Sequence, residues 1–190
     1  MSSFSLSILT RFKEYRFSIY LLLLIPFLLF CDYLITLTNI FNNAFLGVLD
    51  NFIHGLVAVY VLYPFYRKYD LKTIIVVFLI ASLIDIDHFV ALRTISIYEA
   101  VEMLLRPATH SLSFVFTCSL IAWLISKRDF GVFWLFFATL SSHIIRDAAT
   151  GGYTQLFYPA EIFDIPYRIY IISELSLFGA SFLLKGISKY

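Results

Sequence analysis

The residues best suited to chemistry are the four histidines of this 190-residue chain and the aspartates beside them. Asp50 precedes His54 by four positions, and His143 precedes Asp147 by the same interval. Residues four apart share one face of a helix, so each pair can point at one ligand. Imidazole nitrogens and carboxylate oxygens together suit Zn²⁺, Mn²⁺ or Fe²⁺. The two pairs therefore predict a site for a divalent metal.

A second set of candidates is Asp85, Asp87 and His88, which His110 follows after a longer connection. Asp85 and His88 are three apart and also share a helix face. Asp87 points elsewhere if the helix continues and turns inward if the helix ends there. Neither cysteine belongs to a CxxC pair, and the absence of thiolate ligands argues against a closed structural zinc site.

The composition indicates that these residues are held by a membrane protein. The chain is 61% hydrophobic, and charged residues make up 14% of it, whereas soluble domains carry about 25%. Six runs approach the roughly 20 apolar residues that a helix needs to cross a bilayer. They are residues 17–38, 47–66, 72–92, 109–126, 130–147 and 168–186. We expect an all-α, polytopic membrane helix bundle with about six transmembrane helices, forming a single transmembrane domain over residues 1–190.

The basic residues predict an orientation in the membrane. With six helices, both termini and the turns near 67–71 and 127–129 share one side, which carries ten of the fourteen Lys and Arg residues. The other side carries Arg93, Arg106, Arg146 and Arg168. The positive-inside rule then predicts a multi-pass protein of the cell (inner) membrane with cytoplasmic termini. The net charge of +1 says nothing about a nucleic-acid partner, but the sequence has no basic tail or Lys/Arg block, so we expect none.

Alternating crossings place all four histidines at one level, near the outer ends of their helices. Asp32 and Glu174 also lie nearer the outer ends of the first and last runs. A charged residue at the centre of a membrane helix costs about 2.5–3.5 kcal/mol, so such residues usually face the bundle interior and mark function. For Asp32 and Glu174, packing and functional roles are equally expected.

Each candidate also has a simpler interpretation. His54 could be a packing residue, Asp50 a helix cap, and the pair His143 and Asp147 a single interhelical hydrogen bond. Arg106 and Arg146 could anchor the chain at the membrane interface. The gathering of all these residues at one level favours a metal site over separate packing roles.

Four short motifs follow one another in a distinctive order. They are His54-Gly55, DIDH over 85–88, R-x-x-T-H-S over 106–111 and H-x-x-x-D-x-x-T-G-G over 143–152. This ordered set, covering roughly residues 47–160, resembles the YdjM-like family of inner-membrane proteins. Members are described as metal-dependent hydrolases and sometimes as LexA-binding, so the resemblance implies metal-dependent hydrolysis at a membrane.

The chain departs from the family pattern at two places. Ile84 stands where the family often has proline before its D-x-D-H motif. Leu105-Arg106-Pro107 stands where the family often has His-Arg-Gly. The missing histidine leaves the number of bound metals open.

A second family of membrane enzymes shares fragments of the pattern. Arg106-Pro107 and the H-x-x-x-D of 143–147 resemble motifs of the phosphatidic acid phosphatases. That family's lysine seven residues before the arginine is Glu99 here, and its arginine six residues before the last histidine is Phe137. We therefore exclude it.

The sequence is thus interpreted as a membrane-bound, metal-dependent hydrolase that acts on a lipid or membrane-accessible ester or phosphoester at the outer face. Zinc is the expected metal, with manganese or iron as alternatives. The expected ligands are His54, Asp85, His88, His110, His143 and Asp147. Asp87 would act as a further, third-choice ligand or as a general base, and Thr109 and Ser111 would hydrogen-bond the ligands. Arg106 and Arg146 would clamp a phosphate, which an arginine fork fits bidentately.

Three other functions remain open beside the hydrolase. A non-catalytic metal-containing subunit, or a partner-binding protein, would keep the ligands but lack an open coordination position. A haem protein would need two facing histidines in an apolar pocket, which the crowd of carboxylates argues against. An ion or proton transporter should carry polar groups through the cytoplasmic half as well, where this chain is mostly apolar. The oligomeric state is left open.

Overall fold

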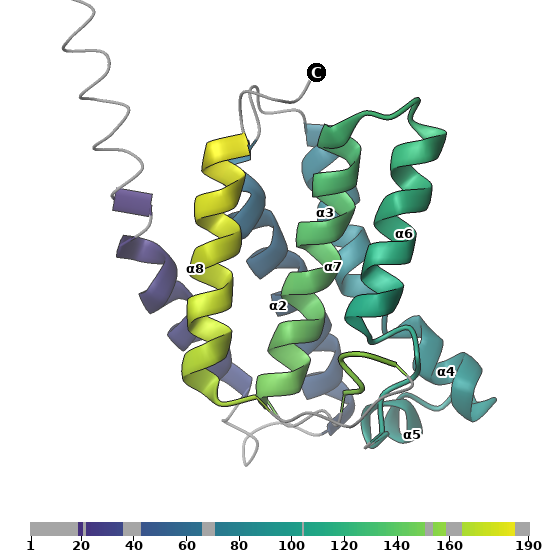
Figure 1. The fold of residues 1–190 in the computed structure, drawn as a ribbon. Helices are drawn as coiled ribbons and strands as arrows, with labels where there is room; N and C mark the ends of the chain where they lie inside the picture. The colour runs from purple at the N-terminus through teal and green to yellow at the C-terminus, as the bar shows by residue number, and fades with distance from the viewer. Residues whose placement is uncertain are drawn as a thin grey trace, which may run out of the picture.

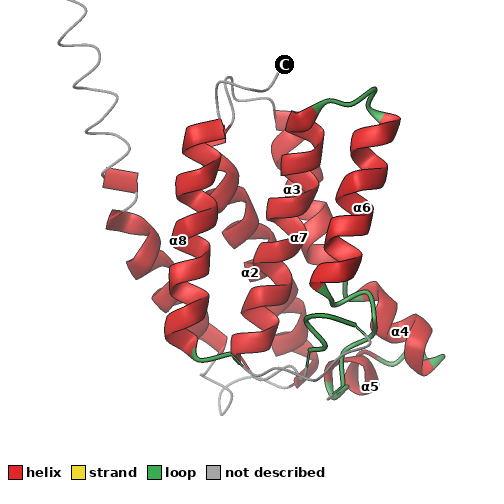
Figure 2. Ribbon diagram, in the orientation of Figure 1, coloured by secondary structure: helices red, strands yellow, loops and turns green. Residues whose placement is uncertain are grey.

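The computed structural model describes residues 19–20, 22–35, 43–65, 71–103, 105–150, 154–158 and 165–184. Every regular element along these residues is helical, which confirms the predicted all-α class (Figure 2). The elements are the helix Leu22–Ile35, α2 (Asn43–Leu62), the short 3-10 helix η1 (Tyr63–Phe65), α3 (Leu71–Leu83), α4 (Ile86–Leu92), α5 (Ile97–Val101), α6 (Leu112–Ile125), α7 (Phe130–Thr150) and α8 (Tyr167–Leu184). Each of the six predicted apolar runs therefore contains a helix.

The lengths and composition of these helices fit a membrane bundle. Three stretches are long and apolar enough to cross a bilayer: Ala44–Phe65, Leu71–Leu92 and Tyr167–Leu184. Two shorter apolar helices are Leu22–Ile35 and Leu112–Ile125. Large apolar side chains such as Leu22 and Leu183 remain exposed on the outside of the bundle, where lipid can cover them. Residues 1–18, 66–70 and 185–190, which carry many of the basic residues behind the predicted orientation, lie outside the described residues.

The long helices run up and down, with α7 among them (Figure 1). α7 contacts α2, α3, α6 and α8, and most of its second half is buried. Its small residues, including Ala138 and Ser142, let the neighbouring helices pack closely. α4 and α5 lie beside the lower end of the bundle in Figure 1, near the last turns of α7. All the polar residues of the candidate site gather at that end.

The run predicted over 72–92 is divided into α3 and α4 by a turn at Ile84 and Asp85. The backbone N–H of Asp87 donates to the carbonyl of Ile84, and that of His88 donates to the carbonyl of Asp85, each at 3.1 Å. The turn reorients the start of α4 and brings Asp87 to the same side as Asp85. It settles the direction of Asp87, which depended on whether the helix continued.

α2 and α3 approach each other closely at Gly55. A Cβ atom at this position would lie 2.4 Å from Ser82 Oγ and 2.5 Å from the Phe78 ring. A larger residue at this position would require the side chains of Ser82 and Phe78 to shift. The close approach packs the neighbouring His54 against His143, with ring centroids 3.7 Å apart.

The connection over residues 93–108 contains the short helix α5. Ser96 caps α5, because its hydroxyl accepts a hydrogen bond from the Glu99 N–H at 3.4 Å. The helix ends at Val101. The extended chain after α5 carries Arg106 towards the end of α7.

Candidate metal centre

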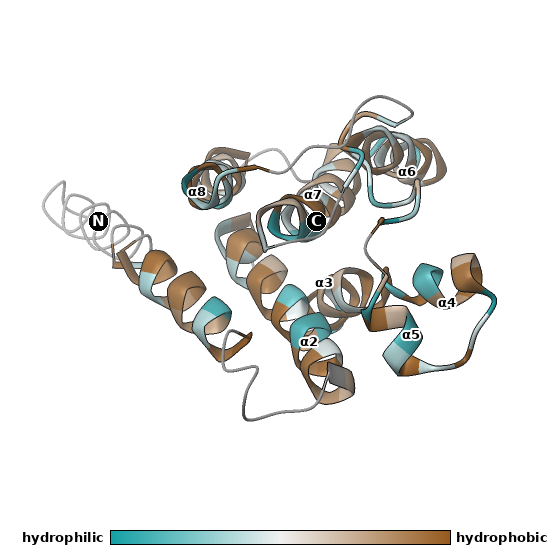
Figure 3. Cartoon of the chain, turned by 90° about the horizontal axis from the view of Figure 1, so that it is seen from below, coloured by the Kyte–Doolittle hydropathy of each residue, from teal (hydrophilic) through white to brown (hydrophobic). Residues whose placement is uncertain are grey.

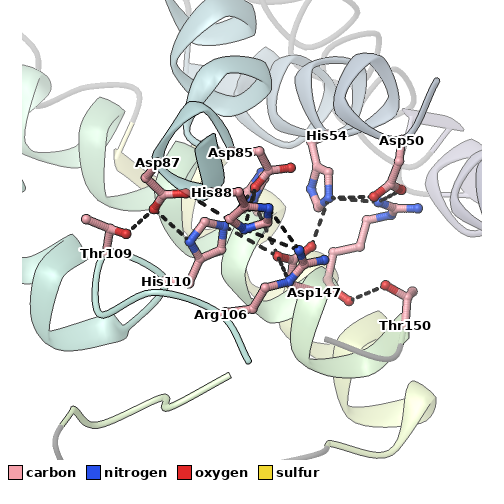
Figure 4. Close-up of polar contacts among 12 residues, drawn as sticks. Asp50, His54, Asp85, Asp87, His88, Arg106, Thr109, His110, Asp147 and Thr150 are labelled. Atoms are coloured by element: carbon pink, nitrogen blue, oxygen red, sulfur yellow. Dashed lines mark hydrogen bonds and ion pairs between the residues drawn. The ribbon is translucent and has the colours of Figure 1, made fainter. Parts of the chain in front are cut away.

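The structure brings all four histidines together, and three of them, His54, His88 and His110, are labelled in Figure 4. His54 comes from α2, His88 from α4, His110 from the turn before α6, and His143 from α7. All four side chains are buried. Ring centroids lie 5.0 Å apart for His88 and His110, and 5.2 Å apart for His110 and His143. The sequence predicted that the four histidines lie at one level, and in the structure their rings are close neighbours.

Four of these residues form a compact central quartet, which we define as Asp85, His110, His143 and Asp147. The Nε2 atoms of His110 and His143 lie 3.3 Å apart. Asp85 Oδ1 lies 2.8 Å from His110 Nε2 and 3.2 Å from His143 Nε2. Asp147 Oδ2 lies 3.6 Å from each of the same two nitrogens. In a tetrahedral zinc site with bonds of about 2.0–2.1 Å, neighbouring ligand atoms are about 3.3–3.4 Å apart, so the quartet matches that arrangement.

The second ring nitrogen of each quartet histidine, Nδ1, has a polar partner outside the quartet. His143 Nδ1 donates to the carbonyl of Ala81 at 2.8 Å, which leaves its Nε2 with a free lone pair. His110 Nδ1 lies 3.1 Å from Asp87 Oδ2, an oxygen that also accepts a hydrogen bond from the Thr109 hydroxyl. Such partners fix the tautomer and the orientation of a metal-binding histidine. Asp87 thus orients His110, with Thr109 supporting it.

The donor atoms of the quartet are arranged to hold a cation. When Nδ1 carries the proton on His110 and His143, two nitrogen lone pairs and two carboxylate oxygens face one another. Asp147 Oδ2 is buried and accepts no hydrogen bond from any described residue, although Arg106 Nε is 3.3 Å away. Acceptors gathered in this way repel one another unless a cation or an additional proton lies among them. The donor set of two nitrogens and two oxygens suits Zn²⁺.

A second group lies on the α2 side of the quartet and is neutralised by Arg146. His54 Nε2 lies 3.1 Å from Asp147 Oδ1, so this carboxylate joins the second group to the quartet. Arg146 Nη1 lies 3.0 Å from His54 Nε2 and donates to Asp50 at 2.6 Å. The same guanidinium donates to Asp32 through Nε at 3.0 Å. Arg146 is 0% exposed, so its charge is balanced by carboxylates inside the bundle rather than by solvent.

A third group lies on the α4 side and contacts Arg106. Arg106 Nη1 lies 3.2 Å from His88 Nε2 and 3.3 Å from His88 Nδ1. His88 Nε2 is 3.7 Å from both Asp85 and Asp87. Burial lowers the pKa of the Arg106 guanidinium, but the nearby carboxylates, Asp147 first, raise it by more, so the group stays charged. A guanidinium therefore lies against His88 as one lies against His54.

The charges of the three groups do not cancel. Five carboxylates lie in this network, from Asp32, Asp50, Asp85, Asp87 and Asp147. With neutral imidazoles, the two guanidinium groups leave a net charge of −3, which is costly to bury. One divalent cation reduces this excess to −1. The quartet is where that cation fits, because arginines already contact the two outer groups.

The structure also shows the partners of three further residues that the sequence singled out. Ser111 caps α6: its hydroxyl accepts from the Phe114 N–H at 3.1 Å and donates to the carbonyl of Ala108 at 2.8 Å. Glu174 is buried beside α7 and accepts a hydrogen bond from Ser142 at 3.0 Å. Asp50 is no simple helix cap, because it pairs with Arg146.

Sequence reasoning missed one participant, Tyr167. Its hydroxyl donates to Asp32 Oδ2 at 2.6 Å, which completes a chain from α8 through the first helix to Arg146 in α7. The residue lies in an aromatic-rich stretch without a motif, so no local signal distinguished it. Asp32, for which packing and functional roles were equally expected, pairs with Arg146 at 3.0 Å.

A model of the YdjM inner membrane protein family matches residues 49–188. The chain is also similar to proteins named Transmembrane protein 267. The one from Danio rerio is 30% identical over 131 residues, covering 64% of this chain and 59% of that protein. The one from Mus musculus is 29% identical over 161 residues, covering 80% and 74%.

This chain therefore spans less than two thirds of the Danio rerio relative that it matches. No solved structure matches it. The family match includes most of α2, all of α3 to α8 and every member of the central quartet, while Asp32 lies before it. With its helical bundle and transmembrane relatives, the chain is a membrane protein that belongs to the YdjM inner membrane protein family.

Proposed function

We propose that this protein is a membrane-bound, metal-dependent hydrolase with one metal per chain, acting on a lipid or membrane-accessible ester such as a phosphoester. The observation that carries the proposal is the convergence of two Nε2 atoms and two carboxylate oxygens in the central quartet. Zinc suits the nearly tetrahedral spacing, and manganese or iron would accept the same donors.

The catalytic roles can be divided among the residues of the centre. Asp85, His110, His143 and Asp147 would hold a divalent metal, with a water molecule as its fifth ligand. The metal would lower the pKa of that water and polarise the scissile group. Asp87 keeps the Nε2 of His110 directed at the quartet through the bond at Nδ1. The second oxygen of Asp87, Oδ1, has no hydrogen-bond partner among the described residues and could accept a proton.

Of the two candidate arginines, only Arg106 is suited to touch a substrate. Its side chain is 15% exposed and lines a cavity beside the quartet, whereas Arg146 is sealed within its ion pairs. Arg106 can turn from Asp147 towards an anion and bind it through two parallel N–H groups. The placement of Arg146 argues against the predicted phosphate clamp and favours a structural role.

Hydrolysis should depend on Arg106 while metal binding should not. Purified protein loaded with Zn²⁺, Mn²⁺ or Fe²⁺ would be assayed on bis-p-nitrophenyl phosphate. Arg106→Gln should lower kcat/KM by about 100-fold, the scale of losing one preorganised donor to developing charge, with metal content unchanged. Arg93→Gln, an exposed arginine after α4, is the matched control and should match the wild type. Metal content retained without any hydrolysis would instead favour the non-catalytic metal-containing subunit.

We propose further that the quartet end faces away from the cytoplasm and that both termini are cytoplasmic, because the segments that six crossings assign to the other side carry ten of the fourteen basic residues of the sequence. Labelling of single cysteines, in a background where Cys31 and Cys118 are serine, tests this. Ile95→Cys lies in the fully exposed turn after α4, and Lys127→Cys lies in the turn between α6 and α7. An impermeant maleimide added to intact cells should label position 95 and spare position 127. The reverse pattern would overturn the orientation.

A further inference from the structure

A cavity of about 150 Å³ opens beside the central quartet, between the start of α2 and the α4–α5 segment. Asp85, His88 and Arg106 form its polar part. Val48, Ile97 and Val101 are among its apolar lining residues, and each of these three is also exposed on the outside. The cavity therefore joins the candidate metal centre to an apolar surface.

The rim of this cavity belongs to a surface suited to lipid. Figure 3 places α4 and α5 at the periphery of the bundle, next to α2 and α3. Other apolar side chains are exposed on α4, where Ile86 is 53% and Leu92 42% exposed. Exposed apolar residues at the edge of a membrane bundle are covered by lipid, so the entrance opens sideways as well as to water.

The size of the cavity limits what can enter it. Pockets that enclose a whole drug-sized molecule have volumes of about 300–1,000 Å³. A volume of about 150 Å³ accepts a compact headgroup and leaves the rest of a ligand outside. The contact between α2 and α5 at the cavity is tight, because a Cβ at Gly47 would lie 2.2 Å from Val101 Cγ2. α5 thus closes directly on α2 and shapes the entrance.

The charges around the cavity favour an anionic group. Arg106 is the one cationic side chain among the described lining residues. The carboxylate of Asp50 is already paired with Arg146 at 2.6 Å, and Asp85 belongs to the proposed metal site. An incoming anion therefore meets the guanidinium of Arg106 and a metal-bearing centre rather than free carboxylates.

We propose that this cavity is a lateral entrance for an anionic amphiphile. Its phosphate-type headgroup is held by Arg106 beside the quartet, while its apolar chain remains in the bilayer along Val48, Ile97 and Val101. This inference rests on the proposed hydrolase and names the substrate class of the same site. Binding through the entrance is measured without turnover, so the two proposals can fail separately.

The test is photo-crosslinking in phosphatidylcholine nanodiscs that contain phosphatidate with a diazirine in its acyl chain. Labelling of peptides that include residues 47–51 and 97–101 should exceed that obtained with the matching diazirine phosphatidylcholine, after normalisation to peptides of α6. Arg106→Gln should reduce the excess by about tenfold, the loss expected for one charge-assisted hydrogen bond. Val101→Trp, which fills the rim, should reduce it similarly.

Two controls decide whether the entrance is specific. Val90→Trp adds the same side chain on exposed α4 outside the cavity and should leave labelling unchanged. Ile97→Trp provides a second rim variant if Val101→Trp does not fold. Equal labelling by the zwitterionic lipid, or labelling unaffected by Arg106→Gln, would overturn the proposal. Binding of radiolabelled inorganic phosphate without any excess lipid labelling would also overturn it, because the ligand would then be a soluble anion.

Discussion

Asp147→Asn should lower the metal affinity by more than about 100-fold and abolish hydrolysis while the protein stays folded. Loss of an outer-shell partner alone costs about 10–100-fold, and Asp147 is a proposed ligand rather than a partner. The amide keeps the volume of the side chain but removes the charge that faces His110 and His143 through Oδ2. It also removes the charge that links the quartet to His54 through Oδ1.

The matched control is Asp129→Asn, at the opposite end of the same helix. Asp129 is buried and accepts a hydrogen bond from the Gly131 N–H at 2.7 Å, so its replacement disturbs the start of α7 and leaves the quartet intact. Metal would be measured by elemental mass spectrometry, and folding by gel filtration and circular dichroism. Equal metal content in wild type and Asp147→Asn would show that this aspartate has only a packing role.

Arg146→Met should lower the free energy of unfolding by about 3–5 kcal/mol, the range for removing one member of a buried ion pair. The substitution keeps much of the volume but leaves the carboxylates of Asp32 and Asp50 without their shared partner. The first helix, α2 and α8 all depend on this arginine, directly or through Tyr167. Thermal unfolding in detergent would measure the change.

The control for charge loss is Arg168→Met, because Arg168 is exposed on α8 and should change stability by no more than about 0.5 kcal/mol. Combining Arg146→Met with Asp32→Asn should cost less than the sum of the two single changes, since the pair acts as a unit. Strict additivity would mean that the two residues are not coupled. Loss of hydrolysis with unchanged stability in Arg146→Met would restore the substrate role predicted from the sequence.

The bundle and the level of its histidines could be predicted because they follow from local features. Apolar runs of bilayer length define helices whatever their neighbours are, and counting crossings then assigns each polar residue to one end. The pairs Asp50 with His54 and His143 with Asp147 lie where helical periodicity puts them, on shared faces. This part of the site required no knowledge of how the helices pack.

The partners of the two arginines could not be predicted in the same way. Both arginines were assigned to the outer side of the membrane. From the sequence alone, both were expected to play the same role, which was to bind a phosphate. Burial distinguishes them: Arg146 projects from a central helix into ion pairs with Asp32 and Asp50, 114 and 96 positions away. Arg106 lies in a connecting segment, and its side chain remains partly exposed. Such contacts depend on helix rotation, which hydrophobic runs do not specify.

The direction of Asp87 needed the tertiary structure as well. A continuous helix would have carried it away from Asp85, and the turn at Ile84 and Asp85 places it behind His110 instead. The same geometry bears on the haem alternative. The His54 and His143 rings are in contact, and the Nε2 atoms of His110 and His143 are 3.3 Å apart. No macrocycle fits between either pair.

X-ray absorption spectroscopy of the zinc-loaded protein tests the central claim most directly, because it reads the ligands of the metal itself. The mononuclear quartet with its bound water predicts a shell of about five nitrogen and oxygen atoms at about 2.0–2.2 Å, with outer scattering from two imidazoles, supplied by His110 and His143. The outer scattering should fall to that of one imidazole in His143→Ala and stay unchanged in His88→Ala. A second metal at about 3.5–4 Å, or the same spectrum from wild type and His143→Ala, would contradict the account.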